Sequence, residues 1–287
     1  MASERQSRLY RTVRLLLGNP KGSFGTVVLV LLLTIALLAP VLAPYDPLEL
    51  HVQTKLALPS STYWFGTDEL GRDILSRIMH GTSISLQIGL LAVGLAALFG
   101  VVTGLIAGYI GGVADAVIMR FWDTLLAFPG VFLAIGIVSI LGPGKAMAIL
   151  AVALGSMPTF ARLARAVTIS TKEMDFVTAE RALGASQWRV MFHTILPHCI
   201  TPILVNMAIA APGAILMEAG LSYLGLGSRP PEPSWGNMLQ AAQGYLAQNW
   251  TYGIFPGAAI TLVVLGMNFF ADALQDALDP RRLRAAR

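Results

Sequence analysis

Five long runs without a charged residue constrain this chain more than any other feature of its sequence. A helix that crosses a bilayer needs about 20 apolar residues, whereas helices buried in soluble proteins show apolar runs of roughly 10 to 14. Only 13% of the 287 residues are charged, compared with about a quarter in soluble domains. The sequence therefore predicts an all-α integral membrane protein. The charge-free runs are Gly22–Tyr45, Ile78–Ala114, Thr124–Gly144, Val190–Met217 and Pro233–Ala271.

Six membrane-spanning helices are predicted, and the basic residues orient them. Lys and Arg concentrate on the cytoplasmic side of membrane proteins. A cytoplasmic N-terminus places two other Arg-rich segments, the one after the fourth span and the C-terminal tail, on the same side, so both termini are predicted to be cytoplasmic. The opposite side then holds few basic residues. The predicted spans are Phe24–Ala43, Ser83–Gly108, Ala114–Leu141, Ala146–Ile169, Cys199–Leu221 and Tyr252–Ala273.

These spans divide the chain into a short N-terminal segment, a first helix, an outer loop, a core domain and a tail. The outer loop is predicted to carry an amphipathic helix in the membrane interface, because Leu70, Ile74 and Ile78 recur every fourth residue between charged neighbours. In a second outer loop, Trp235 suits a position at headgroup level. The predicted boundaries are 1–23, 24–43, 44–80, 81–276 and 277–287, with an inner loop at 172–198 and the second outer loop at 225–250.

The second span carries glycine at every fourth position, at Gly100, Gly104 and Gly108. Such spacing lets two helix backbones approach closely in a membrane. Ordinary enrichment of glycine in membrane helices explains the same pattern equally well. Both readings stay open at the level of sequence.

The inner loop is predicted to fold into two short helices. Asp175 is a suitable N-cap for a helix from Phe176 to Leu183, and Gly184 can adopt the left-handed conformation that ends it. Ser186 can cap a second helix, which is expected to stop near Leu196 because Pro197 follows. A chain reversal between helices needs only about 2 to 8 residues, so this longer segment is interpreted as a docking element.

The same loop resembles the EAA loop of ABC-importer permeases, whose pattern is Glu-Ala-Ala, three residues, Gly, and then Leu-Pro at a fixed distance. Four positions match that pattern: Ala179, Gly184, Leu196 and Pro197. Three positions depart from it. Thr178 stands in place of the Glu, Glu180 in place of the second Ala, and Thr194 at the usual Ile.

Three further blocks resemble the second, C-type permease of dipeptide, oligopeptide and nickel importers. Together with the inner loop they extend the resemblance from about residue 20 to the end of the chain. It implies a type I ABC-importer permease fold in the bacterial inner membrane. The blocks are Phe65-Gly-Thr-Asp-Glu-Leu-Gly-Arg-Asp-Ile-Leu-Ser-Arg77, Ser222-Tyr-Leu-Gly-Leu-Gly227 with Pro231-x-Pro-x-Trp-Gly236, and Asp276-Ala-Leu-Asp279-Pro280.

The resemblance also implies a function and partners. The chain is expected to form half of a pathway for di- or oligopeptides beside a homologous second permease. One or two separate ABC ATPases, which hold ATP and Mg, are expected to receive the loop around Gly184, and an extracytoplasmic binding protein to deliver the solute. The loop residues expected to serve coupling are Asp175, Thr178, Ala179, Glu180, Gly184, Leu196 and Pro197; the expected binding-protein contacts are Asp68, Arg72, Asp73 and Trp235.

Of the three departures from the EAA pattern, Thr178 in place of Glu is expected to affect the capping of the first loop helix. Three residues after an Asp175 cap, a Glu would bond back to the N–H of the cap residue in a capping box. Thr178 is a poorer partner there, and the expected loss is under about 1 kcal/mol because the cap itself remains. Glu180 faces elsewhere on the helix and is not expected to substitute.

Two carboxylates inside predicted spans are candidates for the solute path or its gate, because charges within a membrane are costly and often functional. They are Asp123 in the third span and Glu218 near the outer end of the fifth. For Glu218, an ion pair with the partner permease or an interface position that reaches water is the favoured alternative.

Other functions find less support. Gly142-Pro-Gly144-Lys145 lacks the first Gly and the final Ser or Thr of a phosphate-binding loop, and the four histidines lack metal-ligand spacing. We therefore expect a non-catalytic subunit with no cofactor and no nucleic-acid partner. An ion-coupled secondary transporter needs polar residues within its spans and an internal repeat, and neither is evident. Nickel, glutathione or another small solute remains the alternative to peptides.

Overall fold

A computed structural model gives the fold and describes residues 14–278. Within that range five helices are long and apolar enough to cross a membrane, with a sixth crossing if one bent pair counts as a single span. This confirms the predicted all-α membrane architecture. Residues 279–287 of the predicted basic tail, which include the Asp279-Pro280 part of the C-terminal block, lie outside the described residues. The long helices are α2 (Pro20–Leu42), α3 (Ile74–Ile110), α6 (Lys145–Lys172), α9 (Leu196–Tyr223) and α11 (Thr251–Leu278); the bent pair is α4 (Gly112–Leu126) and α5 (Gly130–Leu141).

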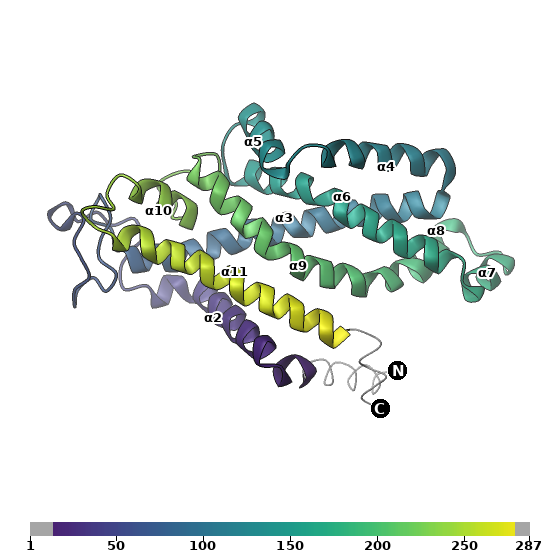
Figure 1. The fold of residues 1–287 in the computed structure, drawn as a ribbon, viewed down its shortest axis with the longest axis horizontal. Coiled ribbons are helices and arrows are strands. Elements are labelled where there is room, and N and C mark those ends of the chain that lie inside the picture. The colour runs from purple at the N-terminus through teal and green to yellow at the C-terminus, as the bar shows by residue number, and fades with distance from the viewer. Residues whose placement is uncertain (1–13, 279–287) are drawn as a thin grey trace.

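The helices form an elongated bundle (Figure 1). Helices α3 and α6 run side by side, and α9 packs against both. Helices α2 and α11 pair on one side of the bundle, whereas α4 runs along α6 on the opposite side. The short helix α10 (Trp235–Ala242) and the loop after α2 occupy one end, and α7 (Asp175–Ala182) with α8 (Gln187–Arg189) occupies the other. The start of α2 and the end of α11 point toward the α7 end, as expected if both lead to cytoplasmic termini.

Close packing of α3 on α6 depends on the three spaced glycines. A Cβ added at Gly104 would lie 2.1 Å from the carbonyl oxygen of Ala161, and one at Gly100 would lie 2.6 Å from that of Met157. At Gly108 the distance to the Arg165 carbonyl oxygen would be 2.8 Å. The backbones thus approach as small-residue motifs allow, which decides between the two readings left open by the sequence.

The third predicted span is not one helix. Helices α4 and α5 meet at an angle of 91°, so the span predicted over 114–141 is broken into two helices. Pro129 has no N–H to donate, and it disfavours helical geometry at Phe128, the residue before it. The chain therefore leaves the helix after Leu126 and begins α5 at Gly130.

The predicted amphipathic helix of the outer loop is also corrected. Leu70 lies in a turn, in which the Asp68 carboxylate accepts its backbone N–H at 2.9 Å. Helix α3 begins only at Ile74, with the Asp73 side chain as its N-cap. Ile74 and Ile78 are therefore residues of α3 and lie in a small core with α10 and α11. The apolar spacing of Ile74 and Ile78 therefore belongs to the start of the membrane helix α3 and not to a separate interfacial helix.

Candidate functional site

The inner loop forms an L-shaped element beyond the ends of the membrane helices (Figure 1). Gly184 turns the chain between α7 and α8 with a φ of +84°, in the left-handed region that favours glycine. A Cβ at Gly184 would meet nothing within 4 Å, so backbone conformation and not space accounts for the residue. Ser186 caps α8 by accepting the N–H of Arg189, as predicted.

The start of the element differs from the prediction. Met174 is the N-cap of α7 and gives no side-chain cap bond, whereas Asp175 is the first helical residue. A carboxylate there still interacts favourably with the positive end of the helix dipole. The capping-box position is then Val177 and not Thr178, so the predicted loss of a capping bond at Thr178 does not arise.

The second helix does not stop before Pro197. The helical path is continuous from Gln187 to Tyr223, passing through a π-helical stretch at Val190–Ile195. The wider turns of a π-helix accommodate breaks in the regular hydrogen-bond ladder, so Pro197, which lacks an N–H, fits at the start of α9. The second arm of the L-shaped element is therefore continuous with the fifth membrane helix.

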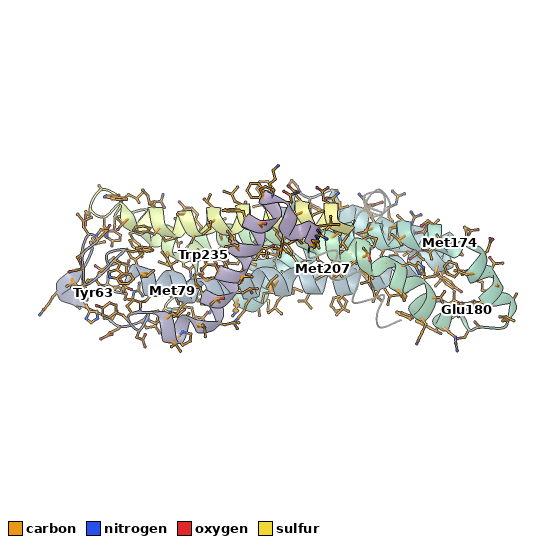
Figure 2. All side chains as sticks on the ribbon, turned by 90° about the horizontal axis from the view of Figure 1, so that it is seen from below. Tyr63, Met79, Met174, Glu180, Met207 and Trp235 are labelled. Atoms are coloured by element: carbon orange, nitrogen blue, oxygen red, sulfur yellow. The ribbon has the colours of Figure 1, made fainter. Side chains whose placement is uncertain are left out.

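Glu180 connects the two arms of the element. Its carboxylate accepts a hydrogen bond from the Thr194 hydroxyl and lies 3.6 Å from Nε of Arg189. Glu180 is half-buried whereas Thr178 is exposed, so the two side chains lie on different faces of α7, as predicted. Figure 2 shows Glu180 and Met174 at the end of the molecule opposite Tyr63. This tie fixes the angle between α7 and the helix that leads into the membrane.

The L-shaped element exposes large apolar side chains to solvent. The exposed fractions of Leu183 and Trp188 are 89% and 64%, and Met174 and Phe176, at the start of α7, are exposed as well. Large apolar side chains exposed to this extent are typical of a protein-binding surface. Of the predicted coupling residues, Asp175, Thr178, Ala179, Gly184 and Pro197 are exposed, and Glu180 and Leu196 are half-buried.

A contact that the sequence did not reveal joins the element to α3. The guanidinium of Arg181 lies 5.0 Å from the centre of the Tyr109 ring, within range of a cation–π interaction. The Nζ of Lys172 donates to the carbonyl oxygen of Tyr109 at 2.8 Å. Tyr109 lies in the last turn of α3, and only its aromatic character at a span end would have marked it.

The two candidate path residues lie in different places. Glu218 is fully buried and accepts a hydrogen bond from Ser222 at 2.7 Å. Its Oε2 has no hydrogen-bond partner among the described residues. Asp123 is exposed on α4 and pairs with Arg162 at 2.6 Å. The structure therefore does not bring them into one site.

The four expected binding-protein contacts are buried. Asp68, Arg72 and Asp73 are at most 7% exposed, and Asp68 pairs with Arg72 at 2.6 Å. Trp235 is fully buried, and its Nε1 donates to the Ile78 carbonyl, so its side chain contacts protein and not lipid headgroups. These side chains organise the outer end, and any contact with a partner passes through the surface that they support.

A larger polar network extends this organisation. The Arg77 guanidinium donates to the Pro47 carbonyl oxygen at 2.9 Å and lies 3.4 Å from the Asp68 carboxylate. The Tyr252 hydroxyl donates to Glu69 at 2.5 Å. Because these residues come from the outer loop, α3 and α11, they hold three segments in a fixed arrangement.

Comparison with known proteins agrees with this geometry. Residues 100–284 match the family model described as "binding-protein-dependent transport system inner membrane component". Residues 7–59 match the "N-terminal TM domain of oligopeptide transport permease C". A chain from the inward-facing MetNI methionine ABC transporter shares the fold, with a TM-score of 0.55 at 18% identity over 75% of this chain and 98% of that one.

Curated relatives align over most of the chain. The dipeptide transport system permease protein DppC of Alkalihalophilus pseudofirmus is 44% identical over 92% of this chain and 86% of its own length. The di/tripeptide permease DppC of Pseudomonas aeruginosa is 43% identical over 93% and 90%. The glutathione permease GsiD of Pectobacterium atrosepticum is 44% identical over 88% and 84%. This multi-pass protein of the bacterial inner membrane belongs to the family of inner-membrane components of binding-protein-dependent transport systems.

Proposed function

We propose that this chain is the C-type permease of an ATP-driven importer of di- or oligopeptides. The observation that carries the proposal is the rigid L-shaped element at the cytoplasmic end. It presents exposed Leu183 and Trp188 beyond the membrane, and it continues without interruption into α9. An apolar protrusion of this kind is suited to fill a cleft on another protein.

The partner at the cytoplasmic end is proposed to be an ABC ATPase, present in one or two kinds, which binds ATP and Mg. Closure of that partner would displace α7 and α8. Because α8 is continuous with α9 and α7 contacts Tyr109 of α3, the displacement would reach two membrane helices at once. The permease itself then needs no catalytic residue.

The partner in the membrane is proposed to be a homologous permease, with the pathway between the two chains. Helix α4 supports this arrangement, because it carries Asp115, Arg120 and Asp123 within a spanning segment. Charged side chains in a membrane face protein or water-filled space and not lipid.

The partner on the outer side is proposed to be a soluble solute-binding protein. The network around Asp68 and Arg77 makes the outer end rigid, and Trp64 is 66% exposed on its surface. A fixed surface that carries an exposed aromatic residue is suited to docking.

The peptide substrate is proposed from the named relatives, two of which are peptide permeases. Glutathione, the solute named for a third, is itself a small peptide. Nickel or another small solute is the alternative, and the binding protein would decide between them.

Reconstitution tests the proposal. The chain, its homologous permease and its ATPases would be placed in proteoliposomes with the binding protein, and uptake of a labelled dipeptide would be measured. We expect uptake only when ATP and every subunit are present. Uptake of nickel without peptide would favour the alternative solute, and uptake by this chain alone under an ion gradient would assign it to the secondary transporters.

A further inference from the structure

An open groove with charged walls lies between α4 and α6. Its charged residues are Asp115, Arg120 and Asp123 from α4 and Arg162 and Arg165 from α6. Two ion pairs cross it: Arg165 to Asp115 at 2.5 Å and Arg162 to Asp123 at 2.6 Å. Three arginines and two aspartates leave the groove with one excess positive charge.

Arg120 carries that excess charge. It is exposed, it lines the groove together with the residues of both ion pairs, and it forms no ion pair with any residue from 14 to 278. Both aspartates are already engaged by the arginines of α6. The groove therefore offers one free guanidinium, whose planar group binds carboxylates with two parallel hydrogen bonds.

The groove lies along α4 and α6, in the cytoplasmic half of the bundle. Arg120 is eight residues into α4, or about 12 Å from the cytoplasmic start of that helix. Val113, Val117 and Phe121 form an exposed apolar stripe of α4, and at about 100° per residue Arg120 lies between this stripe and Asp123, at the edge of the groove. Lipid or the second permease suits the apolar stripe, whereas the exposed guanidinium requires water or polar groups. Helices α2, α9 and α11 lie on the far side of α6 (Figure 1), so they leave the groove open.

We propose that Arg120 binds the C-terminal carboxylate of a peptide in the cytoplasmic half of the pathway. This inference rests on the proposed function, since it concerns peptides that pass between two permeases. The flanking ion pairs hold α4 against α6 and keep both aspartates from neutralising Arg120. The guanidinium is exposed to water, which weakens such a contact, so the peptide is retained only in transit and is released to the cytoplasm.

The experiment uses the complete importer in proteoliposomes in which the parent complex takes up dipeptide. Arg120→Gln removes the charge, Arg120→Lys keeps it, and Arg229→Gln, at an exposed site in the second outer loop, is the matched control. We expect Arg120→Gln to lower the maximal uptake rate by about fivefold, the upper range for an exposed ion pair. ATP hydrolysis stimulated by loaded binding protein should stay near the parent rate, and Arg120→Lys, which keeps the charge but not the two parallel hydrogen bonds, should recover part of the uptake.

Three results would overturn the inference while leaving peptide import intact. The first is parental uptake by Arg120→Gln. The second is a parallel loss of uptake and stimulated hydrolysis, which indicates a structural role. The third concerns a lipid phosphate as the anion. If removing phosphatidylglycerol from the vesicles lowers parent uptake to the Arg120→Gln level, and the variant no longer responds to that lipid, Arg120 binds lipid and not peptide.

Discussion

The hydroxyl of Thr194 donates a hydrogen bond to the carboxylate of Glu180, and both residues stand where the chain departs from the EAA pattern. The family pattern has an Ala and an Ile at these places. Here a polar pair joins α7 to the π-helical stretch before α9, and Arg189 lies beside it. Two departures that look independent in the sequence are one interaction in the structure.

A double-mutant cycle tests this pair. Thr194→Ile alone leaves the half-buried Glu180 without its hydrogen bond, and Glu180→Ala alone leaves Thr194 without an acceptor. We expect the double variant, which restores the family residues, to be less impaired in uptake and thermal stability than the sum of the single changes. The expected coupling is about 0.5–1.5 kcal/mol. Strict additivity would show that the contact does not position α7.

Gly184 sets the direction of the docking element. Gly184→Val places a β-branched residue at φ +84°, with a cost of about 1–2 kcal/mol from the backbone alone. We expect normal membrane abundance, a sharp loss of uptake and a loss of hydrolysis stimulated by loaded binding protein. Ala182→Ser, an exposed change within α7, should be much milder. Full uptake by Gly184→Val at normal abundance would show that the loop is only a connector.

Close packing of α3 and α6 predicts a different kind of failure. Gly104→Ala brings a methyl group within 2.1 Å of the Ala161 carbonyl oxygen, so the helices must separate. We expect overpacking to lower the free energy of unfolding by roughly 1–3 kcal/mol. Thermal stability and membrane abundance should therefore both be lower. Gly94→Ala is the control, because a Cβ there meets nothing within 4 Å. Equal stability of both variants would contradict the packing of these helices.

The membrane helices and the close approach of α3 to α6 could be predicted because each depends on a signal within a short stretch of sequence. Charge-free runs located the helices, and the spaced glycines allowed the approach that the structure confirms. Pro129 was also visible, but a proline is compatible with either a kink or a break, and only tertiary packing decides which. Pro197 shows the reverse, since a π-helical stretch carries the helix through the position where a stop was predicted.

The candidate site was harder to predict because its contacts cross between segments. Gly184 and Ser186 shape only the backbone next to them, as a turn residue and a helix cap. The sequence was therefore sufficient to predict their roles. The burial of Asp68 and Trp235 depends on partners from distant segments, such as Arg77 and Ile78. A single sequence shows charge and aromaticity at these positions but not the side chains that cover them.

Orientation in the membrane is tested by cysteine labelling. Ser61 and Glu232 are exposed in the outer loops, whereas Ser234 is buried as the cap of α10 and is unsuitable. Cysteines at Ser61 and Glu232 should react with an impermeant reagent in spheroplasts, in which the outer face of the inner membrane is accessible. A cysteine at Ala185 should react only after permeabilisation. The native Cys199 is buried and serves as the background. Labelling of Ala185 from outside would reverse the orientation.

The contact between Tyr109 and Arg181 gives the sharpest test of how α3 receives motion from the docking element. Tyr109→Phe keeps the aromatic ring, and the backbone carbonyl that accepts from Lys172 remains, so its uptake should equal that of the parent. Tyr109→Leu removes the ring beneath Arg181 and should cost about 0.5–1 kcal/mol of that contact.

The measurement that separates the two variants is the number of peptides imported per ATP hydrolysed. If the ring transmits motion to α3, Tyr109→Leu should still assemble with the ATPase and hydrolyse ATP, but import fewer peptides per cycle. Arg181→Gln should show part of that deficit, because the Tyr109 ring also lies 5.7 Å from Nζ of Lys172. The double variant should be no worse than Tyr109→Leu, since that change already removes the contact with Arg181. An unchanged ratio in Tyr109→Leu would mean that force enters the membrane through α9 alone.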